Sequence, residues 1–130
     1  MSRALLDTSI LIEDETTAST GRPSTAAISV VTLGELRAGV LRAHSDQARA
    51  ARQARLVAVR ARLVPLPVDE AVAEHYCDAL AHARTVGRTV KATDLLIIAT
   101  ARATGRTLHT LDRAQAGLAQ ELGVIVSGAV

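Results

Sequence analysis

Short apolar segments alternate with longer helical segments along the chain, and this alternation limits the possible folds more than any other feature. Five segments have the length and composition of strands: 3–7, 26–30, 63–66, 107–110 and 123–127. Helical patterns occupy most of the sequence between them, at 8–12, 31–43, 47–62, 69–84, 93–104 and 112–122. Strands that alternate with helices form a parallel sheet covered on both faces. We therefore expect an α/β fold, a three-layer α/β/α sandwich around a central parallel sheet of about five strands.

The core of such a fold has to be built almost entirely from aliphatic side chains. Nearly half of the 130 residues are apolar, but the chain has one Tyr and neither Phe nor Trp. Its length is typical of one compact domain, so we expect a single domain over residues 1–130.

The sequence gives no sign of secretion or of a membrane span. No apolar run approaches the roughly 20 residues needed to cross a bilayer, and the N-terminus lacks the pattern of a signal peptide. Cys77 is the only cysteine, so no internal disulfide can form. We expect a cytoplasmic protein in which Cys77 is a buried packing residue.

Basic charge is concentrated in one part of the chain. Of the 15 basic residues 14 are Arg, and seven of these lie between residues 37 and 62, where Asp46 is the only acid. A phosphate-bearing partner would suit this segment. A solvent-exposed helix face explains the same pattern, and charge alone slightly favours that plainer interpretation.

Four acidic residues fall where parallel sheets bind ligands, beyond the carboxyl ends of the strands. Asp7 and Asp112 directly follow the first and fourth predicted strands, and Glu35 lies in the opening turns of the helix after the second. Asp94 begins a helix that enters a strand, and such a helix usually starts at the opposite edge. Because two helices follow one another over residues 68–104, the second can begin at the same edge and bring Asp94 to the other acids.

Each acid also has a purely structural interpretation. Asp7, Asp94 and Asp112 could cap helices or complement their dipoles. Glu35 could complete a capping box that begins at Thr32. Convergence of all four is harder to explain in this way, because carboxylates a few ångströms apart repel one another strongly. Either some of them hold protons or hard cations such as Mg²⁺ or Mn²⁺, which prefer oxygen ligands, hold them together.

Other chemistries are less well supported. The four His residues are scattered, so no zinc site is evident. Gly34 and Gly39 do not form a phosphate-binding loop, and Ser29 lacks the glycine-flanked elbow of a hydrolase nucleophile. A phosphatase of the haloacid dehalogenase type also places an Asp after its first strand, but its second acid would fall at position 9, which is Ser9. The acids of a response-regulator receiver domain fall at different points in the order.

Four stretches form a familiar combination of motifs: LLDTSILI at 5–12, SVVTLGELRAG at 29–39, TDLLIIATA at 93–101 and HTLD at 109–112. Together they resemble the PIN-domain family, and more closely its VapC toxins, which belong to VapBC toxin–antitoxin pairs. The similarity covers essentially the whole chain in the family's order and spacing. It implies a metal-dependent endoribonuclease with a central parallel sheet between helices.

The resemblance implies a role for each of the four acids. Asp7, Glu35 and Asp94 match the first three acids of the family. Asp112 matches the fourth position, where relatives carry Asp or Asn. Asp7 and Asp94 are then expected to bind Mg²⁺ or Mn²⁺, with Glu35 and Asp112 contributing directly or through water. One or two ions would activate a water against an RNA phosphodiester and stabilise the leaving 3′-oxygen.

Further residues are expected to support the acids and the substrate. Thr8 or Ser9 and Thr110 match positions where small hydroxyl residues steady the acids in relatives. Arg88 and Lys91 shortly precede the third acid and are our candidates for contacts to RNA phosphates.

The Arg-rich helix has two possible partners. At about 100° per residue, five of its basic residues fall on one side: Arg49, Arg52, Arg55, Arg60 and Arg62. They could hold RNA, or they could belong to a protein interface, because VapC relatives form homodimers and bind an antitoxin around these helices.

The resemblance finally implies partners and a biological role. The expected partners are an RNA substrate, a cognate VapB-type antitoxin and a second copy of the chain, in the cytoplasm of a bacterium. The expected function is that of a toxin that hydrolyses RNA and thereby inhibits translation and growth. Two alternatives stay open: a non-catalytic PIN-fold module that binds nucleic acid or protein, and a phosphate-handling Asp enzyme of the haloacid dehalogenase type.

Overall fold

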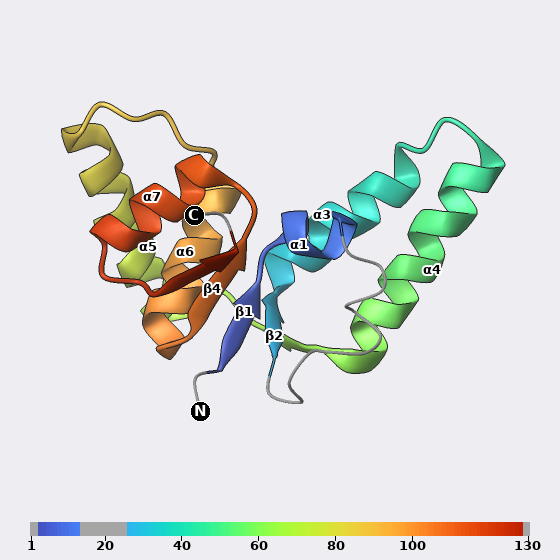
Figure 1. Cartoon of the computed structure of the whole chain (residues 1–130), viewed down its shortest axis with the longest axis horizontal. Helices are drawn as coiled ribbons and strands as arrows, with labels where there is room; N and C mark the ends of the chain where they lie inside the picture. Colours follow the sequence, from blue (N-terminus) through green and yellow to red (C-terminus); the bar gives the residue numbers. More distant parts are fainter. Residues whose placement is uncertain (1–2, 14–25, 129–130) are drawn as a thin grey trace.

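The computed structural model describes residues 3–13 and 26–128, and within them the chain forms one parallel sheet (Figure 1). Its strands are β1 (Ala4–Leu6), β2 (Ala27–Ser29), β3 (Val64–Leu66), β4 (Thr107–Thr110) and β5 (Val126–Gly128). They are arranged in the order β3-β2-β1-β4-β5, and every neighbouring pair is parallel. The first strand of the sequence is therefore the central strand, and the expected five-stranded α/β fold is confirmed.

Helices fill the connections between the strands. They are α1 (Thr8–Glu13), α3 (Val30–Leu41), α4 (Asp46–Arg62), α5 (Glu70–Thr85), α6 (Ala92–Thr104) and α7 (Arg113–Glu121). In Figure 1, α5, α6 and α7 gather on one side of β1, and α1, α3 and α4 gather on the other. Among the described residues, no helix has both the length and the apolar character needed to cross a membrane.

Side chains alternate between two separate parts of the core along each central strand. Leu5 packs in one cluster with Ala27 and Leu108 and with residues of α5, α6 and α7. Its neighbours Ala4 and Leu6 pack in the other cluster, with residues of α1, α3 and α4. Because both faces of the sheet are covered, β1 reads as a continuous apolar run in the sequence rather than as an alternating one.

Two local predictions are wrong. Helix α3 begins after Ser29, whose side chain accepts a hydrogen bond from the Val31 N–H at 3.0 Å, so Thr32 is not its N-cap. Thr32 is instead fully buried inside the helix, and the predicted capping box does not form. Cys77 is exposed, because α5 turns Val72 and Ala79 toward the core and leaves the cysteine on another side.

Helices α5 and α6 follow one another without an intervening strand and pack against each other. The second of them ends at Gly105, whose φ of 64° is the left-handed conformation that glycine adopts most easily. The chain then turns directly into β4. Helix α6 therefore starts at the edge of the sheet where the strands end and runs back toward the edge where β4 begins.

Candidate active site

Asp7 follows the central strand directly and is 5% exposed. Its backbone N–H donates to the His109 carbonyl at 2.9 Å, which extends the pairing of β1 with β4 by one residue. The residue two positions later fixes the side chain, because Ser9 donates to Asp7 Oδ2 from both its hydroxyl, at 2.7 Å, and its backbone N–H, at 3.1 Å. The carboxylate is thus held by its own turn and by the neighbouring strand.

Two hydroxyl groups connect Asp7 to the turn that follows β4. Thr110 Oγ1 lies 3.2 Å from Asp7 Oδ2 and accepts a hydrogen bond from the Asp112 N–H at 3.0 Å. The Ser9 hydroxyl accepts a hydrogen bond from the Leu111 N–H at 3.0 Å. The Ser9 hydroxyl therefore links the Leu111 backbone to the Asp7 carboxylate, and the Thr110 hydroxyl lies between the Asp112 N–H and the same carboxylate.

Gln115 is a buried amide beside the same carboxylate, and its side chain is 1% exposed. Its Oε1 accepts a hydrogen bond from the Thr110 hydroxyl at 2.7 Å. Its Nε2 lies 3.5 Å from Asp7 Oδ1 and 3.4 Å from the backbone carbonyl of Asp94, both long contacts. One side chain thus links β1, β4, α6 and α7.

Gln115 was not predicted from the sequence to be a functional residue. A signal was present, because Gln115 occupies the buried face of α7 together with Ala116, Leu118 and Ala119. A long polar side chain among small apolar ones on a buried face has to find a buried partner.

Glu35 reaches the site from α3. It is half-buried, and its Oε1 accepts a hydrogen bond from the Thr8 hydroxyl at 2.8 Å. This bond ties the second acid to the first turn of α1, immediately after Asp7. The two hydroxyl residues that follow Asp7 in the sequence thus contact different carboxylates.

Asp94 lies in the first turn of α6 and is half-buried. The pKa of its carboxyl is raised from 3.8 to about 6, mainly by burial and then by the charges of Asp7, Asp112 and Glu35, in that order. The charge of Lys91 opposes them. The other three acids therefore lie close enough to Asp94 to raise its pKa.

Asp112 has a structural role as well as a place in this group. It is the N-cap of α7, and its Oδ1 accepts a hydrogen bond from the Gln115 N–H at 3.0 Å. The sequence suggested this cap as the plainest explanation for the residue. Its charge still contributes to the raised pKa of Asp94, so the cap and the acidic group are compatible.

The donor set is chemically suited to a hard divalent cation, because every acidic ligand offered at this edge is a carboxylate oxygen. Within residues 3–13 and 26–128, no three His, Cys, Asp or Glu side chains are gathered closely enough to form a ready-made metal site.

The two basic residues that precede Asp94 lie in different surroundings. Arg88 forms an ion pair with Glu121 of α7, and His82 Nε2 contacts the same carboxylate at 2.9 Å. Hydrogen bonds from His82 and Arg88 lower the pKa of Glu121. Lys91 is the residue before α6 and is close enough to Asp94 to act on its pKa. Their contacts to RNA stay predictions, and Lys91 is the better placed of the two.

The fold and the site together define a class of α/β proteins that carry an acidic centre at the carboxyl edge of a parallel sheet. The family can be stated more closely from sequence similarity. A model of the PIN domain matches residues 4–121, and the chain belongs to the PIN-domain family.

Known members of this family resemble the chain over most of its length. Ribonuclease VapC8 of Mycobacterium tuberculosis is 42% identical over 100 residues, which cover 75% of this chain and 88% of the relative. Ribonuclease VapC4 of the same organism is 40% identical over 121 residues, covering 89% and 91%. A chain in the crystal structure of VapBC-5, a toxin–antitoxin system of M. tuberculosis, superposes with a TM-score of 0.81 at 34% identity, covering 99% of this chain and 98% of that one.

Proposed function

We propose that the chain is a metal-dependent endoribonuclease and the toxin of a VapBC-type toxin–antitoxin pair. The observation that carries the proposal is the position of Asp94 near Asp7, Asp112 and Glu35, whose charges raise its pKa. The names of the relatives support it, since VapC8 and VapC4 are ribonucleases and VapBC-5 is a toxin–antitoxin system. The inferred effect on the cell is cleavage of RNA, followed by inhibition of translation and growth.

Asp7 and Asp94 are the residues we assign to hold Mg²⁺ or Mn²⁺, with Glu35 and Asp112 acting directly or through water. A bound ion would lower the pKa of a water molecule and stabilise negative charge on the phosphate. The protein's own contribution is to hold like charges in place against their repulsion. Hydrogen bonds from Ser9 orient Asp7, and the Thr8 hydroxyl orients Glu35.

One of the acids also has to accept the proton of the attacking water. Hydrolysis then leaves a 5′-phosphate and a 3′-hydroxyl, because the water attacks phosphorus and the 3′-oxygen departs with a proton. Ser9 stands where a haloacid-dehalogenase-type enzyme would carry its second acid, and its hydroxyl donates to Asp7 instead. This use of position 9 favours the nuclease over that alternative.

The proposal is tested with Asp7→Asn and Asp94→Asn in a Mg²⁺-dependent RNA cleavage assay. Both variants should lose cleavage and growth arrest while circular dichroism shows an unchanged fold. Asp69→Asn is the matched control: Asp69 caps α5 by accepting a hydrogen bond from the Val72 N–H at 2.9 Å, and Asn caps helices equally well. Full activity in both site variants would overturn the mechanism.

Association with a VapB-type antitoxin and with a second copy of the chain completes the proposal. The solved relative is a member of a toxin–antitoxin system, and its chain covers nearly all of this one. Co-expression with the cognate antitoxin should restore growth and yield a stable complex. Light scattering of the toxin alone would show whether it is a homodimer, and a monomer at all concentrations would refute that part.

A further inference from the structure

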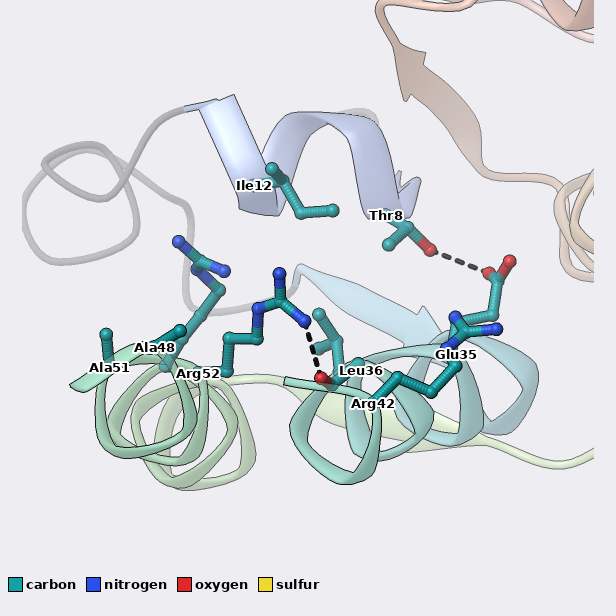
Figure 2. Close-up of a pocket in the computed structure, with 10 residues that line it drawn as sticks. Thr8, Ile12, Glu35, Leu36, Arg42, Ala48, Ala51 and Arg52 are labelled. Carbon is teal, nitrogen blue, oxygen red and sulfur yellow. Dashed lines mark hydrogen bonds between the residues drawn. The ribbon is translucent and has the colours of Figure 1, made fainter. Parts of the chain in front are cut away.

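A groove of about 610 Å³ opens between α1, α3 and α4, directly beside the acidic site (Figure 2). Thr8 and Glu35, which are joined by a hydrogen bond, stand at one end of it. Figure 2 shows the two side chains meeting there, with Ile12 farther along α1. The groove is therefore continuous with the cluster of acids, and its volume lies within the range of about 300–1,000 Å³ that is usual for ligand sites.

Positive charge dominates the walls of this groove. Three arginines line it, Arg42, Arg52 and Arg55, against one acid, Glu35. Arg52 reaches from α4 to α3, where its guanidinium donates to the Gly39 carbonyl at 2.7 Å, as Figure 2 shows. This contact uses one of the five N–H groups of the guanidinium and fixes the direction of the others. Arg42 is exposed at the end of α3.

We propose that this groove binds the RNA strand adjoining the scissile phosphate, with Arg42 and Arg52 contacting backbone phosphates. The inference rests on the proposed function and extends it by naming the path of the substrate. A strand whose phosphodiester lies against Glu35 has to continue past that residue, and the groove begins there. Arginine is suited to phosphate because its planar fork can donate two hydrogen bonds to the same group.

The composition of the chain determines how RNA would be held in this groove. Proteins that bind single strands commonly stack bases on aromatic rings. This chain has one Tyr and no Phe or Trp, and Tyr76 packs against the core cluster on the other side of the sheet. Binding in the groove therefore depends on phosphate contacts, which makes it strongly salt-dependent and weakly selective for sequence.

The test measures binding of a 5′-fluorescein-labelled, 20-nucleotide single-stranded RNA by anisotropy, in EDTA so that the RNA stays intact. The variant is Arg42→Gln/Arg52→Gln in the full chain. For single strands, each phosphate contact contributes about −0.7 to the slope of log K against log salt. The slope of the Arg42→Gln/Arg52→Gln variant should therefore be smaller in magnitude by about 1.4. At 50 mM salt the affinity should fall by about one order of magnitude for each Arg.

The chain offers a matched control on the same two helices. Arg37 of α3 and Arg60 of α4 line a separate hollow, together with Leu33 and Val57. Arg37→Gln/Arg60→Gln removes the same charge and should leave the salt dependence unchanged. Arg42→Lys/Arg52→Lys keeps the charge and should retain most of the slope, which separates charge from any loss of stability that follows from losing the bond to Gly39.

The outcomes separate this inference from the proposed function. If the wild type cleaves RNA with Mg²⁺ but the groove pair binds RNA as tightly as the wild type, the inference fails and the nuclease stands. Equal losses in the groove pair and the control pair would also overturn it, because the effect would then be one of net charge. Normal RNA binding with loss of the antitoxin complex would show that the groove is a protein interface instead. A wild type that neither binds nor cleaves RNA would refute both proposals.

Discussion

Replacement of Asp94 by Asn should stabilise the protein in the absence of metal, although it should abolish activity. A carboxyl pKa raised from 3.8 to about 6 corresponds to about 3 kcal/mol when fully expressed. Asp94 is only half-buried, so solvent screening reduces this, and we expect about 1–1.5 kcal/mol. Asn keeps the shape of the neutral acid and removes the repulsion from Asp7, Asp112 and Glu35. The midpoint of thermal unfolding should rise by roughly 3–6 °C.

The pH dependence follows from the sign of the shift. Between about pH 4 and pH 6 the folded protein keeps a proton on Asp94 that the unfolded chain has lost, so the wild type loses stability as the pH rises through this window. The Asn variant has no such group to titrate. Its advantage should be absent near pH 3.5, grow up to about pH 6 and stay constant above pH 7.

The assay is thermal unfolding followed by circular dichroism in EDTA from pH 3.5 to 8, with Asp69→Asn as the control that should show a flat, near-zero difference. Adding Mg²⁺ should reverse the order, because the ion binds the folded wild type and stabilises it by mass action. The reasoning would be refuted by an Asp94→Asn variant that is no more stable than the wild type at pH 8, or by an advantage that does not vary with pH.

Three further outcomes are expected. Gln115→Leu should lower cleavage more than tenfold and raise the Mg²⁺ concentration needed for half-maximal activity, because Asp7 loses its buried amide neighbour; unchanged Mg²⁺ dependence would contradict this. Ser9→Ala should lower the free energy of unfolding in urea by about 1–2 kcal/mol, because it removes a hydroxyl that bonds both Asp7 and the Leu111 N–H. In the control Thr85→Ala, the exposed hydroxyl bonds only its own helix, so the free energy of unfolding should change by less than about 0.5 kcal/mol. Mg²⁺ should raise the unfolding midpoint of the wild type but not of Asp7→Asn, and equal shifts in both would argue against an ion at Asp7.

The fold was predictable because its physical requirements are visible along the chain. A strand buried on both faces must be apolar throughout, and Ala4–Leu6 shows this directly. The position of Asp94 also followed from the order of helices and strands alone. Two successive helices between β3 and β4 let the second helix begin at the edge of the sheet where the strands end. Neither prediction depends on which side chains are in contact.

What the sequence did not reveal depends on contacts between distant residues. Ser29 and Thr32 are both suitable N-caps, and only packing decides that the helix begins at the first of them. Gln115 contacts residues 108 and 21 positions away, so its role cannot be read from its neighbours. Arg88 was expected to contact RNA at the cleft. In the folded chain it forms an ion pair with Glu121 of α7, and the sequence does not show that these two residues meet.

The central position of β1 has a consequence for biosynthesis. Asp7 lies 103 and 108 residues before Thr110 and Gln115, whose side chains contact its carboxylate. The strand that carries it is paired on one side by β4, which is translated about a hundred residues later. A ribosome still short of α7 therefore carries a nascent chain with an unfinished acidic centre. The acidic centre is therefore completed only after α7 has been synthesised.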